Sequence, residues 1–413
     1  MPLSPPKFPF KLAFNSGATS DAPYGTRQSA VLNAAGLAEA RRCIAAWPGY
    51  QPTPLVDLPG LAKTLTIGRI SYKDEAARFG LRSFKPLGGA YAVERCLMRV
   101  VAEKTGRRDI DPAEILDGSH AAIVAQVTVT AATDGNHGRS VAWGARMFGC
   151  RCVIYINEAV TEAREHAIAA YGAEVRRNPG SYDDAVRETF AVARREGWHV
   201  IPDTPGDGQE DGVALDAPRE VTQGYAVLAA EAIEQLTEGV VPSHLFLQAG
   251  VGGMAAAVCA GFWETFGAKR PKTILVEPEQ CACWFASLKD QRPTAITGDT
   301  DSFMSGLACG EVSQLAWEIL QPGAAAAMTL PDAAAKETMC LLADGIEGDP
   351  PLVAGESGVA GVAALIAAAQ DETARSALGL GPDSHVLVIG SEGATDEALY
   401  REVVGRSWQE VAA

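Results

Sequence analysis

Short runs of aliphatic and β-branched residues alternate with helical stretches along most of this 413-residue chain. The pattern predicts strands at 67–72, 122–129, 152–156, 173–176 and 198–202, with helices at 90–104, 136–147, 161–171 and 182–196. Further strands are predicted at 244–248, 273–276 and 385–389. Apolar strands with helices between them are typical of parallel sheets covered on both faces. The sequence therefore predicts an α/β fold with two open, mostly parallel sheet domains.

The length also indicates two domains, because one compact core usually holds ~100–200 residues. Residues 1–35 are rich in Pro, Ser, Gly and Asn and are expected to form an irregular N-terminal arm. Residues 90–204 are expected to form a smaller α/β domain. Residues 36–89 and 205–413 are then expected to form the large domain.

Composition excludes several classes of function. Lys and Arg number 35 against 51 Asp and Glu, a net charge of −16, which argues against nucleic-acid and anionic-membrane partners. The nine cysteines are scattered without a CxxC pair and the six histidines are dispersed, so no metal site is expected. Neither a signal peptide nor a membrane span of ~20 apolar residues is found, which favours a cytoplasmic protein. Whether Cys283 and Cys309 stay free thiols or pair is left open.

Lys85 stands immediately before Pro86, at a predicted helix start, in the string Ser-Phe-Lys-Pro-Leu-Gly-Gly. Proline suits the first helical position, where its missing N–H has no cost. The positive end of the helix dipole disfavours the ammonium form and lowers the lysine pKa from about 10.4, toward a range useful for Schiff-base chemistry. A solvated lysine at a helix start gives the same pattern and remains the alternative.

Three further motifs follow predicted strands. Asn136 lies in Thr-Asp-Gly-Asn-His-Gly, a turn whose side-chain amide can point into the crevice at a strand end, although an ordinary helix cap looks the same. Gly250–Met254 forms a glycine-rich turn into a helix, whose backbone N–H groups suit a phosphate. Ser391 follows the last strand. The GxGxxG spacing of a dinucleotide site is absent.

In this order, the four motifs resemble those of the tryptophan-synthase-like (fold type II) pyridoxal-phosphate (PLP) enzymes, which include the threonine and serine dehydratases. The resemblance implies that PLP lies in the cleft between the two domains, with Lys85 as its Schiff-base residue. It also implies that Asn136 contacts the 3′-oxygen and Ser391 faces the pyridine nitrogen. The phosphate is then expected on the backbone of Gly250, Val251, Gly252, Gly253 and Met254. His137 is expected to be a packing residue.

Asp134, two residues before Asn136, departs from the plain dehydratase pattern. Together with Val-Glu-Pro at 276–278 and Ser-Glu-Gly-Ala-Thr-Asp at 391–396, it gives a likeness to the diaminopropionate ammonia-lyases from about residue 35 to 405. This resemblance implies a PLP-dependent carbon–nitrogen lyase that converts D- or L-2,3-diaminopropionate into pyruvate and ammonia, and a homodimer. Asp134 is then expected to be the base for the D isomer and Asp203 for the L isomer. A threonine or serine dehydratase and a non-catalytic PLP-binding protein are the alternatives.

Overall fold

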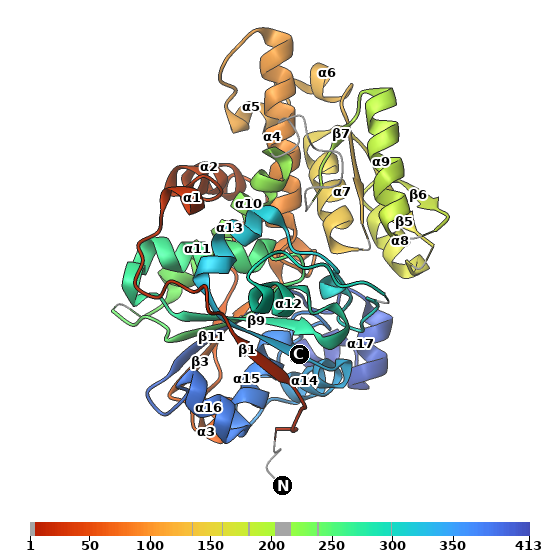
Figure 1. Cartoon of the computed structure of the whole chain (residues 1–413). Helices are drawn as coiled ribbons and strands as arrows, with labels where there is room; N and C mark the ends of the chain where they lie inside the picture. Colours follow the sequence, from red (N-terminus) through yellow and green to blue (C-terminus); the bar gives the residue numbers. More distant parts are fainter. Residues whose placement is uncertain are drawn as a thin grey trace. The chain divides into compact units, whose positions relative to one another are not determined.

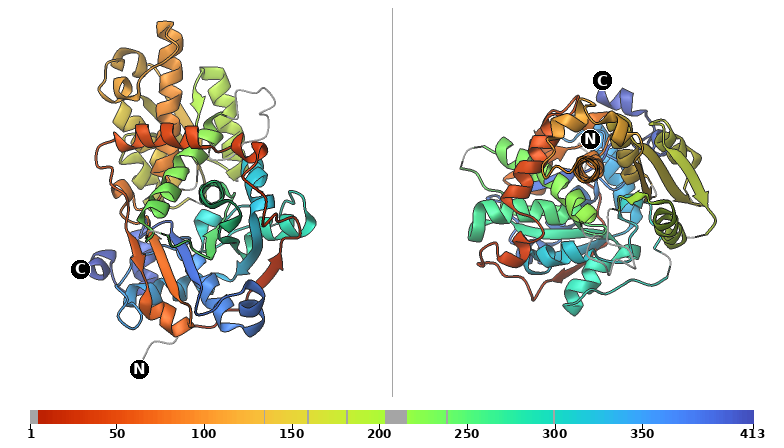
Figure 2. Two further views of the ribbon diagram at one scale, coloured as in Figure 1. Left: turned by 90° about the vertical axis from the view of Figure 1, so that its left-hand side faces the viewer. Right: turned by 90° about the horizontal axis from the view of Figure 1, so that it is seen from above.

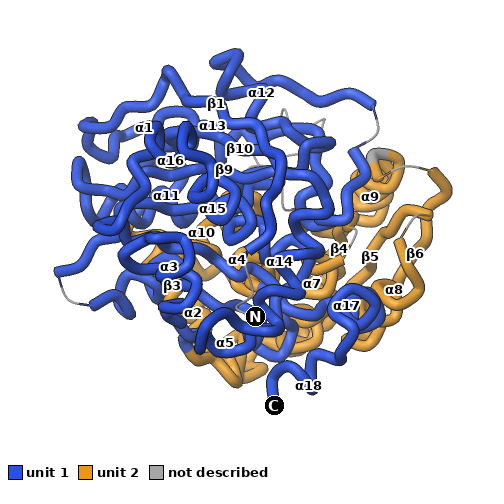
Figure 3. The backbone as a smooth tube through the Cα atoms, turned by 90° about the horizontal axis from the view of Figure 1, so that it is seen from below, with its two compact units in different colours: residues 1–33, 52–83, 228–413 blue, residues 34–51, 84–227 orange. Residues whose placement is uncertain are grey.

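The computed structural model describes residues 5–133, 135–158, 160–180, 182–202, 216–237, 239–298 and 300–413. The chain divides into two compact units (Figure 3). Unit 1 comprises residues 1–33, 52–83 and 228–413, and unit 2 comprises residues 34–51 and 84–227. Helix α10 (Asp216–Gln235) begins in unit 2 and ends in unit 1.

Unit 1 contains a seven-stranded sheet whose inner strands are all parallel. In sheet order the strands are β1 (Lys11–Phe14), β10 (Ala324–Leu330), β9 (Lys272–Pro278), β8 (His244–Gln248), β11 (His385–Gly390), β3 (Arg69–Asp74) and β2 (Leu55–Asp57). The edge strands β1 and β2 are antiparallel to their neighbours. The left view of Figure 2 shows β3 beside β11, which are paired although they are far apart in sequence. The predicted mostly parallel sheet is confirmed.

Helices cover this sheet on both sides (Figure 1). One face packs in the main core against α3 (Pro59–Leu65), α14 (Asp332–Asp344), α15 (Ala360–Gln370) and α16 (Glu372–Leu378). The other side carries α11 (Gly253–Phe266), α12 (Cys283–Asp290) and α13 (Gln314–Gly323). Unit 1 also contains α1 (Thr26–Ser29), α17 (Glu397–Val404) and α18 (Trp408–Ala412). Ten of the eleven residues of α15, Ala360 to Ala369, are buried, which explains its apolar sequence.

Unit 2 contains a four-stranded parallel sheet in the order β6 (Glu174–Asn178), β5 (Arg151–Asn157), β4 (Thr128–Ala132) and β7 (His199–Val200). Alternate side chains of β5 point to opposite faces. Val153 and Tyr155 pack against α9 (Tyr182–Glu196), whereas Ile154 faces α7 (Asn136–Phe148). The other helices of the unit are α2 (Ala34–Ala45), α4 (Pro86–Thr105), α5 (Pro112–Leu116), α6 (Ala121–Val124) and α8 (Glu162–Ala169).

The N-terminal arm is not irregular throughout, because Lys11–Phe14 form β1 and pair with β10. The units also divide at different residues from those expected. Residues 34–51 belong to unit 2, where Trp47 packs edge-on against Trp143 and Phe148 at centroid distances of 5.9 and 6.1 Å. The first part of α10 belongs there too, since it packs on α4 so closely that a Cβ at Gly224 would lie 1.9 Å from the Leu87 carbonyl oxygen.

One element prediction was wrong, and one inner strand of the unit 1 sheet was not predicted. Residues 121–124 are helical, and the predicted strand at 122–129 begins only at Thr128. Strand β10 was not predicted, because its sequence Ala-Ala-Ala-Ala-Met-Thr-Leu is rich in the strongest helix former. Its position between β1 and β9 overrides that local preference.

Candidate cofactor-binding site

Lys85 is the N-cap residue of α4, directly before Pro86 at the first helical position, as predicted. Its Nζ lies 5.6 Å from the ring centroid of Phe84 and 6.0 Å from that of Tyr225. These two rings pack edge-on, with their centroids 4.6 Å apart. The lysine head is therefore held against an aromatic pair within unit 2.

The two glycines after Lys85 lie inside α4 and do not form a turn before it. They allow close helix packing. A Cβ on Gly88 would lie 2.4 Å from the Tyr225 ring, and a Cβ on Gly89 would lie 1.9 Å from Ser140 Oγ on α7. The first turn of α4 can therefore approach both α10 and α7, which fixes the helix that carries Lys85.

Asn136 is the first residue of α7, after a turn held by Thr133. The Thr133 hydroxyl accepts the backbone N–H groups of Gly135 and Gly138, both at 3.1 Å. His137 is buried and its Nε2 donates to the Ile201 carbonyl at 2.7 Å, in agreement with its predicted packing role. The contact between Gly89 on α4 and Ser140 on α7 follows Lys85 by four residues on one helix and Asn136 by four residues on the other. The expected bases Asp134 and Asp203 lie outside the described residues.

The glycine-rich loop after β8 leads into α11 in unit 1, as predicted. Gly250 and Gly252 adopt positive φ values of 49° and 103°. A Cβ on Gly252 would lie 2.4 Å from the Trp284 ring, and Trp284 Nε1 donates to the Gly250 carbonyl at 3.0 Å. Trp284 therefore packs against the loop and bonds to it, and only glycine fits at position 252. The first N–H groups of α11 have no partner within the helix and are suited to an anion.

Glu277, in β9, holds Trp284 in place. Its carboxylate accepts the backbone N–H groups of Trp284 and Phe285, both at 2.8 Å, and the Cys283 thiol at 3.3 Å. Burial raises the pKa of Glu277 to about 7, although these hydrogen bonds oppose the rise. Cys283 and Cys309 are not joined by a disulfide bond in this structure. Burial, with the nearby Glu277 charge, holds the pKa of Cys283 well above its ordinary value, so this sulfur stays protonated.

Ser391 directly follows β11 and is 3% exposed. Its hydroxyl oxygen accepts a hydrogen bond from Nε2 of Gln248, the last residue of β8, at 2.7 Å. The same Nε2 donates to the Ile389 carbonyl at 2.8 Å. Gln248 thus joins the glycine-rich loop, two residues further on, to Ser391. A neutral hydroxyl and a neutral amide occupy this end of the sheet.

Each unit by itself carries groups that suit PLP. In unit 1 these are helix-start N–H groups for a phosphate and a buried hydroxyl for a ring nitrogen, and in unit 2 they are an amine and an amide. Sequence reasoning missed Gln248, Glu277 and Trp284 as supports of the site. Gln248 had a visible signal, since it is the one polar side chain after Leu-Phe-Leu in a buried strand.

The family described as "Pyridoxal-phosphate dependent enzyme" matches residues 46–392. The chain belongs to this family. The PLP-dependent enzyme is 40% identical over 370 residues to the diaminopropionate ammonia-lyase of Escherichia coli (strain K12), covering 88% of this chain and 90% of that one. Its fold matches the crystal structure of holo diaminopropionate ammonia lyase from Escherichia coli with a TM-score of 0.86, 35% identity and 98% of each chain covered.

A second structure of the Escherichia coli enzyme, in complex with an aminoacrylate-PLP azomethine reaction intermediate, matches with a TM-score of 0.84 and 36% identity over 98% of both chains. The cofactor of this PLP-dependent enzyme is therefore pyridoxal 5′-phosphate, and its fold is fold type II. Within the described residues, none of the helices is both long and apolar enough to cross a membrane.

Proposed function

We propose that this enzyme eliminates ammonia from 2,3-diaminopropionate and yields pyruvate. In balance, diaminopropionate and one water give pyruvate and two ammonia molecules. The likeness to diaminopropionate ammonia-lyase over nearly the whole chain carries the proposal. Asp134, between Thr133 and Gly135, supports it, since a carboxylate next to the cofactor contact suits a substrate with a second ammonium group.

Four segments of the chain would hold the cofactor in this proposal. Lys85 binds its aldehyde carbon, Asn136 its 3′-oxygen, residues 250–254 its phosphate and Ser391 its ring nitrogen. PLP supplies an electron sink for the negative charge that develops at Cα. A neutral hydroxyl facing the ring nitrogen does not hold it protonated as a carboxylate would, and the weaker sink suits elimination more than aminotransfer.

Asp134 and Asp203 are the proposed bases, Asp134 for the D isomer and Asp203 for the L isomer. Removal of the Cα proton by a carboxylate on one side of the substrate permits loss of the β-amine as ammonia. Bases on both sides would allow both isomers to react. Lys85, once released from the cofactor, is the alternative proton carrier.

The test measures pyruvate and ammonia from D- and L-diaminopropionate, with serine and threonine assayed in parallel. Serine or threonine turnover that exceeds diaminopropionate turnover would favour the dehydratase alternative, and no turnover would favour a binding protein. We expect Asp134→Asn to lose mainly D turnover and Asp203→Asn mainly L turnover, each by ~10²–10⁴-fold. Asparagine keeps size and polarity, so PLP content should be unchanged. Equal loss of both isomers in both variants would contradict the assignment of bases.

A homodimer in the cytoplasm completes the proposal. Its support is the resemblance to fold type II enzymes. Sedimentation of the holoenzyme measures the oligomeric state directly.

A further inference from the structure

The side-chain amide of Gln248 can adopt only one orientation. Its nitrogen lies 2.8 Å from the Ile389 carbonyl oxygen, which has no hydrogen to give. If the amide were flipped, two oxygens would face each other at that distance, so the NH₂ group must point toward Ile389. One of its two hydrogens bonds this carbonyl, and the other bonds Ser391 Oγ at 2.7 Å.

This orientation determines the role of Ser391. A serine hydroxyl has one hydrogen and two lone pairs. Since Ser391 Oγ accepts from Gln248, its own hydrogen must point elsewhere, and among the described residues no acceptor receives it. The hydroxyl is buried, so bulk water is a poor alternative partner. Ser391 is therefore prepared to donate one hydrogen bond to a ligand.

We propose that Gln248 is a positioning residue that fixes Ser391 as a donor to the PLP ring nitrogen and thereby keeps that nitrogen unprotonated. The inference rests on the proposed role of Ser391 in the site. A pyridine nitrogen accepts a hydrogen bond only through its lone pair, which protonation removes. Gln248 thus sets the electron demand of the cofactor without touching it.

The test uses holoenzyme loaded with PLP that carries ¹⁵N in its ring, because the ¹⁵N resonance separates protonated from unprotonated pyridine. The wild type is expected to give the unprotonated signal. Gln248→Glu is nearly isosteric, but its carboxylate accepts the Ser391 hydrogen and turns a hydroxyl lone pair toward the ring. The ring signal of this variant should move toward the protonated position.

Gln248→Met is the second variant, because it keeps the side-chain length and removes both donors. The freed Ile389 carbonyl then accepts the Ser391 hydrogen, and the ring signal should move in the same direction. Adding Ser391→Ala to Gln248→Glu should abolish most of the difference, since Gln248 acts through Ser391. The matched control is Gln370→Met. Gln370 is the last residue of α15, and among the described residues its amide donates to the Pro5 carbonyl, away from Ser391.

A protonated ring nitrogen in the wild type would overturn the inference, whether or not the variants fold. So would an unmoved signal in PLP-loaded Gln248→Glu, or an equal shift in the Gln370→Met control. The proposed function fails separately. Unprotonated wild-type PLP that responds to Gln248 but does not turn over diaminopropionate would reject that substrate and leave the role of Gln248 intact.

Discussion

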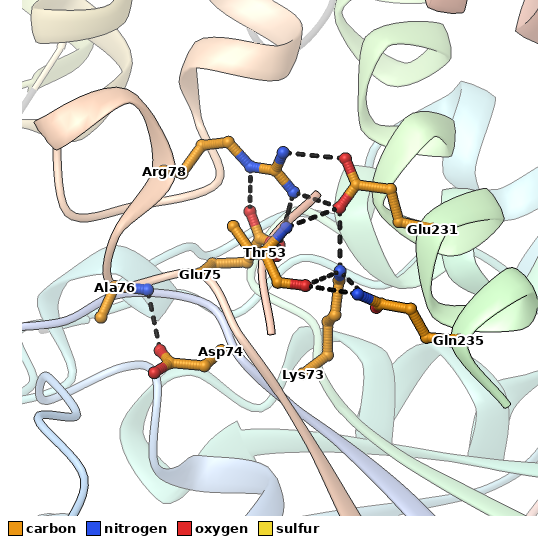
Figure 4. Close-up of polar contacts among 8 residues, drawn as sticks. All are labelled: Thr53, Lys73, Asp74, Glu75, Ala76, Arg78, Glu231 and Gln235. Carbon is orange, nitrogen blue, oxygen red and sulfur yellow. Dashed lines mark hydrogen bonds and ion pairs between the residues drawn. The ribbon is translucent and has the colours of Figure 1, made fainter. Parts of the chain in front are cut away.

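Two regions at the carboxyl ends of the unit 1 strands have opposite chemistry. The ionic cluster, at the end of β3, contains Lys73, Glu75, Arg78 and Glu231, with the polar partners Thr53 and Gln235 (Figure 4). The neutral end, after β8 and β11, contains Gln248, the loop 250–254 and Ser391. Both are buried and polar, yet only the neutral end matches a cofactor site.

The ionic cluster is fully bonded within itself. Arg78 forms two hydrogen bonds with each of Glu75 and Glu231, at 2.7 to 2.8 Å. Lys73 donates to Glu231 and Gln235, both at 2.8 Å, and to the Thr53 carbonyl at 2.6 Å. None of the buried side-chain atoms of the four charged residues lacks a partner. The cluster joins the C-terminal half of α10 to β3, and each of its charged groups is already paired within the protein.

The neutral end keeps spare bonding capacity. Gln248 Oε1 is buried and has no hydrogen-bond partner among the described residues. The first N–H groups of α11 and the Ser391 hydrogen are also available to a ligand. A buried polar region with spare donors therefore indicates a binding site better than a dense group of charges does.

Two buried glutamates show the same contrast in their pKa values. Burial acts to raise the pKa of Glu231, but the hydrogen bonds and charges of Arg78 and Lys73 outweigh it and lower the pKa below its ordinary value. Burial raises the pKa of Glu277 to about 7, because its hydrogen-bond partners are backbone N–H groups and a thiol instead of cations.

The largest effect is expected from Arg78→Met. Removing one partner of a buried ion network leaves an uncompensated charge and costs about 3–5 kcal/mol. We expect the unfolding free energy of unit 1 in urea to fall by that amount. Lys63→Met is the control, since the pair of Lys63 with Glu347 lies on the surface and its loss should change little. A loss in Arg78→Met no greater than in the control would remove the distinction between the two regions.

A smaller effect is expected from Glu277→Gln, and here the variant should keep more unfolding free energy than the wild type as pH rises. The folded pKa of about 7 lies above the ordinary value of 4.5, so the folded state holds the proton more tightly. The stability that this group contributes is present below about pH 4.5 and is lost as pH rises toward 7. At 1.36 kcal/mol per pKa unit, the loss is on the order of 3 kcal/mol.

Glutamine resembles the protonated acid and cannot ionise. The Glu277→Gln variant should therefore lose less unfolding free energy than the wild type between pH 5 and pH 8, measured by urea titration at each pH. Glu347→Gln, at an exposed acid, is the control. An unchanged pH slope in Glu277→Gln would mean that Glu277 is ionised in the folded protein throughout this range.

The sequence predicted the elements that local pattern controls. Strand β8 and helix α9 have the predicted bounds, 244–248 and 182–196, since β8 is a short apolar run and the apolar residues of α9 recur at helical spacing. Strand β10 was missed because alanine has no strand preference, and only its neighbours in the sheet make it extended. The compact units divide the chain at other residues than the expected domains do, because Trp47 and Gly224 contact residues far along the chain.

The site residues were also predictable only where a local pattern marks them. Lys85, Asn136, the glycine-rich loop and Ser391 were found because they lie at the starts of helices and ends of strands, where a motif is read in one stretch. The support of Ser391 by Gln248 joins residues on two strands, and that of the loop by Trp284 joins two segments that only the sheet brings together. No spacing in the sequence reveals such pairs.

The smallest effect is expected from Gly252→Ala, which tests whether the neutral end binds the phosphate. At a φ of 103° an alanine is strained, and its methyl group would lie 2.4 Å from the Trp284 ring. The loop must therefore shift, and its N–H groups would no longer point at the phosphate. Strain of about 1–3 kcal/mol corresponds to a roughly 5- to 150-fold weaker PLP affinity, measured by titrating the apoenzyme.

Gly348→Ala is the matched control, because Gly348 has a φ of 97° with open space around its Cβ position. Gly348→Ala should reduce stability while leaving PLP affinity unchanged. Equal PLP affinity in the two variants would place the phosphate away from the loop, and the neutral end would then be no more a binding site than the ionic cluster.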